Sequence, residues 1–395
     1  MQFINRNLSS EKIVDGVFKI AEMAKSDSDP STVNATIGSL YDEENHLVAF
    51  KTFYHNLNEL SDATKAKYAE SFRGNAAFNQ TVIKHVLQDK LTLPAMCLAT
   101  SGGTGGISMT FKNILEPNQT ILLPSIAWSS YQLMAKEFGL KIANYDIFDL
   151  EDLIRQIDEL AKVQDKILMV INSPCHNPTG ISYDEATWQH LIEHLNTLTI
   201  PVVILNDIAY IDYSADLANS RNYLKAFNQA NENILIAIAF SLSKTMTSYG
   251  LRTGALILAN RNQTLLEQTF NTFEKTCRVL WSNVNNAAMV AFSKTLSEDA
   301  EAFQKEKALY INLLKERAQC FLKEAKACNL ETYPYQEGFF ITLKLDDNAK
   351  RDEVHERLMA NHIYTVKVER GIRLSICSIP LAKLTGLAKR IKAVY

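Results

Sequence analysis

From Pro94 to about residue 260 the chain alternates short apolar runs with amphipathic stretches, and this alternation limits its possible folds more than any other feature. The apolar runs are AMCLAT, ILLP, IANYDI, KILMVINS, PVVILND, ILIAIAF and ALILAN. Strands that alternate with helices imply crossover connections and a mostly parallel sheet covered on both faces. The sequence therefore predicts an α/β fold, in which ligands bind at the carboxyl ends of the strands.

Apolar residues recur at helical spacing on both sides of this predicted sheet. Before it, the spacing predicts helices around Ser10 to Ala24, from Phe50 to Leu60 and from Phe72 to Lys90. After it, we expect one long charged helix over Leu296 to Cys328, followed by a small α+β region. A chain of 395 residues favours two domains. We expect a large domain over residues 43–295 and a smaller one made of residues 1–42 and 296–395.

Composition narrows the class of partner. With 41 Lys and Arg against 44 Asp and Glu, and no long basic run, nothing favours nucleic acid or an anionic membrane. No apolar stretch reaches about eighteen residues, and the start, MQFINRNLSSEK, has no apolar signal core. We therefore expect a soluble, cytoplasmic protein that binds a small molecule. The six cysteines lack CxxC spacing, so neither a disulfide framework nor a metal site is expected.

Polar groups follow the predicted strands at the points where they end. The glycine-rich run from Ser101 to Gly106 opens a helix, whose unpaired N–H groups suit a phosphate or simply allow tight packing. Trp128 follows the next strand, where it could cover a flat ligand or belong to the core. Asn177 lies in a proline-bounded turn, either as a structural residue or as a donor to a ligand oxygen.

Two further strand ends carry charged side chains. Asp207 follows a buried apolar run, where an unpaired carboxylate is costly, so it needs a cationic partner. Tyr210 follows three residues later. Lys244 comes after ILIAIAF with Ser241 beside it and Arg252 eight residues on. Such an amine attacks carbonyls only if its pKa is lowered, and the alternative is an ordinary solvated lysine.

One ligand would use all of these groups. Pyridoxal phosphate has a phosphate, a flat ring, a ring nitrogen that must stay protonated, a phenolic oxygen and an aldehyde for a lysine. The order and spacing of the residues also resemble the class I/II aminotransferases of fold type I, closest to the aspartate and aromatic aminotransferase group. The resemblance covers nearly the whole chain. It implies the fold-type I architecture, pyridoxal phosphate as cofactor and transamination as the reaction.

The resemblance also implies a role for each matching residue. Lys244 matches the catalytic lysine that forms a Schiff base with the cofactor. The phosphate is expected to bind Gly102, Gly103, Thr104, Ser241, Arg252 and, from the neighbouring subunit, Tyr68. The ring and its polar atoms are expected to meet Trp128, Asn177, Asp207 and Tyr210. The substrate is expected to lie under Gly38, with Arg373 binding its α-carboxylate bidentately.

The choice of substrate depends on Arg278. The run CRVLWSN resembles the R-x-x-[WY]-S-N segment of aspartate aminotransferases, in which the arginine crosses the dimer interface to bind the substrate's side-chain carboxylate. A surface arginine is the alternative, because Val284 and Asn285 replace the family's Pro-Pro. Tyr131 replaces a family histidine three residues after the stacking tryptophan, so the neighbour of Asp207 must differ.

The resemblance thus implies a homodimeric aminotransferase that acts on L-amino acids and 2-oxo acids, with dicarboxylates of the aspartate and glutamate type as the first choice. An aminotransferase for aromatic or varied apolar amino acids is the main alternative, and a β-lyase on the same scaffold is another. A pyridoxal-phosphate-binding regulatory module belongs to a different class. Such modules usually carry a DNA-binding segment, for which the N-terminal region is too short and insufficiently basic.

Overall fold

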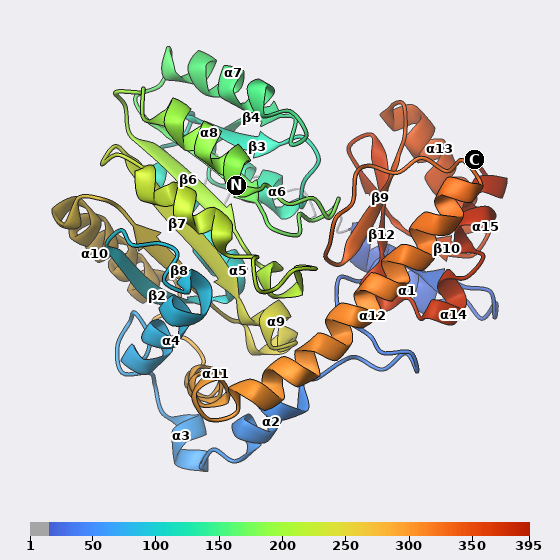
Figure 1. Cartoon of the computed structure of the whole chain (residues 1–395), viewed down its shortest axis with the longest axis horizontal. Coiled ribbons are helices and arrows are strands. Elements are labelled where there is room, and N and C mark those ends of the chain that lie inside the picture. The colour runs from blue at the N-terminus through green and yellow to red at the C-terminus, as the bar shows by residue number, and fades with distance from the viewer. Residues whose placement is uncertain (1–15) are drawn as a thin grey trace, which may run out of the picture.

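The computed structural model describes residues 16–395, which form two lobes connected by the long helix α12 (Ala300–Ala327), as Figure 1 shows. The larger lobe holds the main sheet, and the smaller lobe combines segments from both ends of the chain. The helix expected around Ser10 to Ala24 is present as α1 (Gly16–Ser26). Residues 10–15 of the expected helix lie outside the described residues. So does the start of the chain, MQFINRNLSSEK, from which a cytoplasmic location is predicted.

In the part of the chain that the structure describes, seven strands form the sheet of the larger lobe. They are β2 (Ala95–Ser101), β3 (Thr120–Pro124), β4 (Lys141–Tyr145), β5 (Ile167–Asn172), β6 (Val202–Asp207), β7 (Ile234–Ser241) and β8 (Thr253–Ala259). Their order is β2-β8-β7-β6-β5-β3-β4, and β8 is antiparallel to both of its neighbours. The connection from β7 to β8 is too short for a crossover, so this pair must be antiparallel. The predicted, mostly parallel α/β sheet is confirmed.

Consecutive residues of each central strand enter different hydrophobic cores, because side chains alternate between the two faces of a sheet. In β6, Val202 and Ile204 belong to one core, whereas Val203 and Leu205 belong to the other. This double burial explains the continuous apolar runs in the sequence. The first core is covered by α4 (Ala76–Leu87), α7 (Leu150–Ala161) and α8 (Glu185–Leu195), and the second by α5 (Gly102–Ile114), α6 (Ser130–Glu137) and α10 (Gln263–Leu280).

Short helices complete this lobe. They are α2 (Lys51–Asn58), α3 (Asp62–Ala66) and α9 (Leu242–Thr245), with the 3₁₀ helices η1 (Ile211–Tyr213), η2 (Asn222–Gln229) and η3 (Tyr249–Leu251). The helices expected from Phe50 to Leu60 and from Phe72 to Lys90 are α2 and α4, each shorter than expected by several residues.

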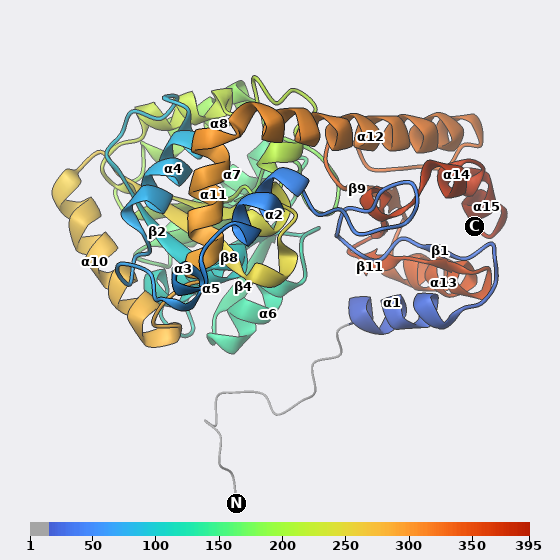
Figure 2. The same cartoon turned by 90° about the horizontal axis from the view of Figure 1, so that it is seen from below.

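The prediction of one long helix over Leu296 to Cys328 is wrong at its start. The chain forms α11 (Asn286–Glu298) and then α12, with a break at Asp299, whose φ of −123° lies outside the helical region. At this break the Asp299 carboxylate accepts a hydrogen bond from Asn56 Nδ2 at 2.7 Å. α12 then places Phe303 in a core of the larger lobe and Phe321 in that of the smaller one, so it is shared by both (Figure 2).

The smaller lobe unites the two ends of the described chain. β1 (Val33–Asn34) pairs in parallel with β10 (Ile363–Tyr364), and β9 (Phe340–Lys344), β12 (Gly371–Ser375) and β11 (Val366–Val368) form an antiparallel sheet. The 3₁₀ helix η4 (Ile376–Ser378) and the helices α13 (Asn348–Ala360), α14 (Leu381–Leu384) and α15 (Leu387–Ala393) complete it. The domain boundaries after residues 42 and 295 stay predictions, and the second of them falls inside α11.

Three further features of the described residues concern membrane-spanning helices, metal-binding groups and disulfides. Within residues 16–395, no helix is both long and apolar enough to cross a bilayer. The same residues hold no group of three or more His, Cys, Asp or Glu side chains arranged to bind a metal ion. All six cysteines are free thiols.

Candidate active site

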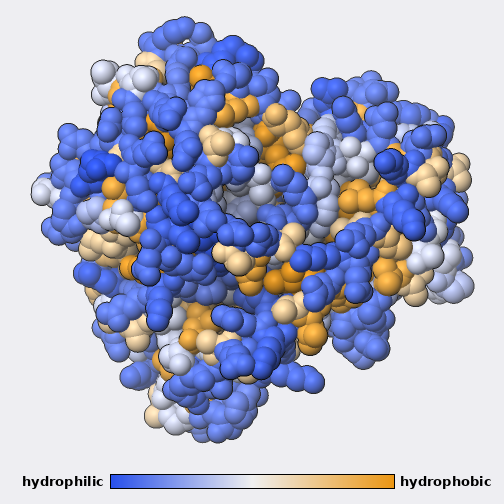
Figure 3. Space-filling model, in the orientation of Figure 1, coloured by the Kyte–Doolittle hydropathy of each residue, from blue (hydrophilic) through white to orange (hydrophobic). Residues whose placement is uncertain are grey.

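A cavity of about 650 Å³ lies between the lobes, at the carboxyl ends of β5, β6 and β7. Asp207 and Ser241 border it from the larger lobe, and Phe340 and Arg373 border it from the smaller one. Its volume is typical of sites for small molecules. Figure 3 shows that this face of the protein is largely hydrophilic and that apolar residues gather where the two lobes meet.

The register of the sheet explains why polar side chains meet here. Asn172, the last residue of β5, pairs with Asp207 of β6, and Asp207 in turn pairs with Ala239 of β7. The strands are parallel, so their carboxyl ends reach the same edge of the sheet. The expectation that chemistry gathers at this edge agrees with the position of the cavity.

Lys244 lies on the one-turn helix α9 and points into the cavity. Its Nζ donates a hydrogen bond to the Gly38 carbonyl at 2.7 Å and lies 4.7 Å from the centre of the Tyr249 ring. Burial lowers the pKa of Lys244 to about 8, and the positive charges of Arg373 and Arg252 act in the same direction. A substantial fraction of the amine is therefore neutral near pH 8, as a nucleophile or a general base requires.

One end of the cavity is suited to an anion. Arg252 has the left-handed conformation (φ 51°), and its Nη1 donates to Ser243 Oγ at 3.2 Å. The guanidinium lies against the start of α5, which has no side-chain cap. A Cβ on Gly102 would lie 2.5 Å from Arg252 Nη2. The φ of Gly102, 68°, is also one that residues with a side chain rarely adopt. Gly102 thus lets the guanidinium approach the helix.

The remaining predicted phosphate ligands from this chain lie at the same end. Gly103, Thr104 and Ser241 border the cavity beside Arg252. The free N–H groups of the first turn and the positive end of the helix dipole add to the charge of the guanidinium. The arrangement can therefore bind a phosphate group.

Asp207 is 5% exposed and borders the cavity. One carboxylate oxygen accepts a hydrogen bond from Tyr131 Oη at 2.5 Å, and the other accepts one from the Ala209 N–H at 3.0 Å. Burial raises the pKa of Asp207, whereas these two hydrogen bonds and the charge of Lys244 oppose the rise. No cation within residues 16–395 forms an ion pair with this carboxylate, so the cationic partner expected from the sequence would have to come from a ligand.

Tyr131 fills the position at which the sequence departs from the aspartate aminotransferase pattern. Its ring meets Trp128 edge to face, with centroids 5.4 Å apart and an interplanar angle of 82°. Because both residues are near the start of α6, the same turn places the indole at the cavity and the phenol on Asp207. The altered neighbour of Asp207, left open by the sequence, is therefore this phenol.

Arg373 brings a second cation to the cavity from β12. Its Nη1 donates to Asn177 Oδ1 at 3.3 Å, its Nη2 donates to the Thr36 carbonyl at 2.7 Å, and its guanidinium lies 4.4 Å from the centre of the Phe340 ring. Its buried Nε has no hydrogen-bond partner within the described residues. A buried donor without a partner is costly, so this guanidinium is suited to bind a carboxylate.

Gly38 and Tyr210 close the cavity around Lys244. A Cβ on Gly38 would lie 3.1 Å from Phe340 Cζ, so a larger residue would force this ring to move. The Tyr210 ring lies 5.5 Å from Lys244 Nζ, and burial raises the pKa of its hydroxyl. The phenol therefore stays a neutral hydrogen-bond donor unless a ligand changes its surroundings.

Tyr68 and Arg278, the two residues expected to act across a dimer interface, do not border the cavity of their own chain. Tyr68 is 82% exposed. Arg278, in the last turn of α10, donates to Ser282 Oγ at 2.5 Å and lies 4.7 Å from the centre of the Phe72 ring. Both stay candidate residues for a neighbouring subunit.

The cavity-lining residues that sequence reasoning missed include Asn172, Tyr249 and Phe340. Asn172 ends a predicted strand, so the strand-end rule could have found it. Its Oδ1 accepts a hydrogen bond from the Asn177 N–H at 2.7 Å and its Nδ2 donates to the Asp207 carbonyl at 2.8 Å. Phe340 carries no local signal, because its role depends on how the lobes meet.

Comparison with known proteins identifies relatives over nearly the whole chain. The family model described as aminotransferase class I and II matches residues 31–391. An aspartate aminotransferase of Pseudomonas aeruginosa is 22% identical over 69% of this chain and 69% of its own length.

Solved structures show the same fold. An aminotransferase of Anaerococcus prevotii superposes with a TM-score of 0.95 and 26% identity, covering 100% of this chain and 99% of its own. An aromatic-amino-acid aminotransferase of Burkholderia pseudomallei, solved with covalently bound pyridoxal phosphate, superposes with a TM-score of 0.82 and 19% identity, covering 100% of both chains. These superpositions establish the fold class expected from the sequence.

Proposed function

The chain belongs to the class I and II aminotransferase family, and we propose that it transfers the amino group of an L-amino acid to a 2-oxo acid, acting first on dicarboxylates of the aspartate and glutamate type. The observation that carries this proposal is a single cavity bordered by Lys244, Asp207 and Arg373. An amine, a carboxylate without a cation and a partly unpaired guanidinium are the groups that transamination needs. The matched aspartate aminotransferase supports the choice of dicarboxylates.

The cavity fits pyridoxal phosphate as cofactor. Arg252, Ser241 and the start of α5 would hold its phosphate, because they place a guanidinium, a hydroxyl and free N–H groups at one end. The buried Asp207 carboxylate would hold the proton on the ring nitrogen. Trp128 would cover the ring, and Asn177 and Tyr210 would donate to its phenolic oxygen. When bound, the cofactor supplies an aldehyde that takes the amino group and a ring that takes the electrons of the substrate's Cα–H bond.

The protein's own groups would position the substrate and move the proton. Arg373 would bind the α-carboxylate through two N–H groups, which fixes the direction of the Cα–H bond. The neutral amine of Lys244 would take the proton from Cα and return it to the cofactor, since burial keeps its pKa near 8. Closure of the cavity between the lobes would limit the access of water.

We further propose that the active unit is a homodimer. Tyr68 and Arg278 lie outside the cavity of their own chain, in a region with several exposed apolar side chains. The exposed fractions are 41% for Phe72, 78% for Val279 and 47% for Leu280. A second copy placed on this region would bury these side chains. Tyr68 and Arg278 of the first copy would then reach the cavity of the second. The cytoplasmic location stays a prediction from the sequence.

The Arg278→Leu variant tests the substrate class. We expect the protein to convert L-aspartate and L-glutamate in the half-reaction, followed by the absorbance of the bound cofactor. Loss of a charge-assisted pair with the side-chain carboxylate should lower kcat/KM for both by about a hundredfold. Conversion of L-phenylalanine should change little. Lys275→Leu, an exposed cation on the same helix, is the matched control and should keep full activity.

Mixed dimers give a sharper form of this test. A subunit with Lys244→Ala retains Arg278, and a subunit with Arg278→Leu retains Lys244. Neither variant alone should turn over aspartate well. After the two are unfolded and refolded together, about a quarter of the wild-type activity should return, because half of the dimers are mixed and each has one complete site. No recovery, with dimers confirmed by sedimentation, would contradict a shared site.

One observation favours the aromatic alternative. Trp128, Tyr131, Tyr249 and Phe340 all border the cavity, and aromatic rings suit an apolar side chain. Conversion of phenylalanine alone, unaffected by Arg278→Leu, would establish this alternative. Pyruvate and ammonia formed from a cysteine conjugate would instead indicate a β-lyase, and bound cofactor without turnover would indicate a regulatory module.

Tyr131→Phe tests the new neighbour of Asp207. The substitution removes a hydrogen bond to a buried carboxylate, which is worth about 1.5–3 kcal/mol. The carboxylate is then a stronger base and draws the proton from the ring nitrogen toward itself, so kcat should fall by about tenfold while KM for the amino donor changes little. Stopped-flow absorbance measures both.

A matched control is Tyr145→Phe. Tyr145 is an equally buried tyrosine whose hydroxyl donates to the Val170 carbonyl at 2.7 Å, away from the cavity. It should lower the thermal midpoint and leave kcat unchanged. A folded Tyr131→Phe variant with the wild-type kcat would show that the phenol does not act through Asp207.

A further inference from the structure

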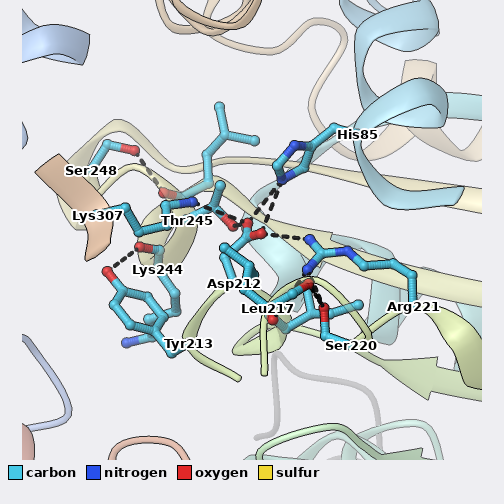
Figure 4. A network of polar contacts seen from close by, with 12 residues as sticks. His85, Asp212, Tyr213, Leu217, Ser220, Arg221, Lys244, Thr245, Ser248 and Lys307 are labelled. Atoms are coloured by element: carbon cyan, nitrogen blue, oxygen red, sulfur yellow. Dashed lines mark hydrogen bonds and ion pairs between the residues drawn. The ribbon is translucent and has the colours of Figure 1, made fainter. Parts of the chain in front are cut away.

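A buried group of charged residues lies behind the Lys244 turn and does not border the cavity (Figure 4). Its centre is Asp212 of η1, which is 1% exposed. Among the described residues, Asp212 contacts four side chains from four other segments. They are His85 Nε2 at 3.0 Å, Arg221 Nη2 at 2.5 Å, Thr245 Oγ1 at 2.6 Å and Lys307 Nζ at 3.5 Å. We name these five residues the Asp212 cluster.

The cluster is connected to the lysine through its neighbours in the chain. Thr245, which follows Lys244 directly, donates its hydroxyl to Asp212. Tyr213, which follows Asp212, donates its hydroxyl to the Lys244 carbonyl at 3.0 Å. Two adjacent residues of one segment therefore hold two adjacent residues of the other, as Figure 4 shows.

The helix that carries Lys244 cannot hold itself in place. α9 has four residues and no side-chain cap at its start. A single turn of helix is unstable without outside contacts, because nucleation fixes several residues for one hydrogen bond. The position of Lys244 must therefore come from tertiary contacts. Tyr213 bonds to the backbone of Lys244 itself, and Asp212 bonds to the side chain of the next residue, Thr245.

Asp212 is held as an anion. Burial alone would raise its pKa, but His85, Lys307 and Arg221 together hold the pKa of this carboxyl well below its usual range. Burial lowers the pKa of Lys307 to about 8, against the attraction of Asp212. Arg221 Nε is buried and has no hydrogen-bond partner within residues 16–395.

Burying such a charged cluster costs free energy, because each charge loses its hydration. Two buried cations share one carboxylate, and apolar residues of the same size often give equal or higher stability. What an apolar cluster could not provide is a fixed acceptor for the Thr245 hydroxyl. The charges thus fix the position of the carboxylate that accepts the Thr245 hydroxyl.

We propose that the Asp212 cluster is a positioning device for Lys244: through Thr245 it holds α9 so that the amine stays buried against the Gly38 carbonyl. Asp212 is a positioning residue, because it touches neither the cavity nor the amine. This inference rests on the proposed function in that Lys244 is the residue that reacts. Loss of the connection allows α9 to shift, and water then reaches the amine.

Thr245→Val tests the proposal, because valine keeps the shape of threonine and removes its hydroxyl. The pKa of Lys244 is measured in the full-length protein without cofactor, by competitive labelling with acetic anhydride and mass spectrometry. It should rise by about one unit as the amine gains water. In the cofactor-loaded protein, kcat should fall by about tenfold with KM little changed. Thr245→Ser, which keeps the hydroxyl, should retain both wild-type values.

Thr295→Val is the matched control for a merely structural effect. Thr295 is a fully buried threonine of α11 whose hydroxyl donates to the Ala291 carbonyl at 2.8 Å, outside the cluster. It should lower the thermal midpoint as Thr245→Val does and leave the Lys244 pKa and kcat unchanged. If Thr245→Val does not fold, Thr245→Ala removes the same hydroxyl with a smaller side chain and should raise the Lys244 pKa in the same way.

The proposal is overturned if folded Thr245→Val has wild-type values for the Lys244 pKa and kcat. If Thr245→Val does not fold, wild-type values in Thr245→Ala overturn it in the same way. The labelling measurement needs no turnover, so it separates the two inferences. A wild-type protein that fails to transaminate would contradict the proposed function, whereas the response of the Lys244 pKa to Thr245→Val still decides the role of the cluster.

Discussion

Replacing Lys244 by alanine is expected to reduce transamination to background, a loss of more than about 10⁴-fold, because it removes both the amine that would hold the cofactor and the base that would move the proton. No neighbour in the described part of the chain can take its place. Tyr210 and Tyr249, whose rings surround the amine, are phenols whose pKa is raised by burial. The half-reaction with aspartate or glutamate, followed by cofactor absorbance, measures the loss.

This variant should still fold. Within residues 16–395 the amine makes one hydrogen bond, to the Gly38 carbonyl, and burial disfavours its charged form. Removing a desolvated cation costs little, so the thermal midpoint of the cofactor-free protein should change by only a few degrees. Lys244→Arg is the companion variant, since it keeps a cation but cannot bond to an aldehyde. Retained transamination in either folded variant would contradict the proposed mechanism.

Asp207→Asn is expected to have the second largest effect, a fall in kcat of about a hundredfold or more. Asparagine has nearly the same shape, and its oxygen can still accept the hydrogen bond from Tyr131. It has no negative charge, however, and cannot stabilise a proton on the ring nitrogen of the cofactor. Because Arg373 is untouched, the apparent affinity for the amino donor should change little. Single-turnover absorbance separates the two quantities.

Two further variants define what this result means. Asp207→Glu keeps a carboxylate and should retain more activity than the asparagine variant, although its longer side chain disturbs the contact with Tyr131. Asp184→Asn removes a carboxylate that accepts hydrogen bonds at the start of α8, away from the cavity, and should leave kcat unchanged. If Asp207→Asn reacted as fast as the wild type, the ring nitrogen would not need the carboxylate.

The sequence by itself predicted the sheet and most of the groups at its edge. Asp207, Ser241 and Lys244 each lie at or just beyond the end of an apolar run, and this local pattern determines both the strand and the position of its polar end. Parallel strands then bring those ends together, whatever the details of packing. The resemblance to a family added Arg373 and Gly38, which no local pattern would have placed at the cavity.

The tertiary structure decided the contacts that tune these groups. The bond from Tyr131 to Asp207 joins residues 76 positions apart, and it forms because α6 packs on the face of the sheet that holds the second core. The Asp212 cluster collects side chains from residues 85 to 307, and α12 brings Lys307 to it. At the break before α12, the Asp299 carboxylate accepts a hydrogen bond from Asn56, which is distant in the chain.

The physical reason is the range of the interactions. Burial alternation and strand ends follow from the two-residue period of a strand, which a few consecutive residues are enough to express. Hydrogen bonds and ion pairs require atoms to meet within about 3 Å, and for residues distant in the chain that depends on every element packed between them. The sequence therefore determined which groups reach the cavity, and the packing of the helices decided how the lysine and the carboxylate are held.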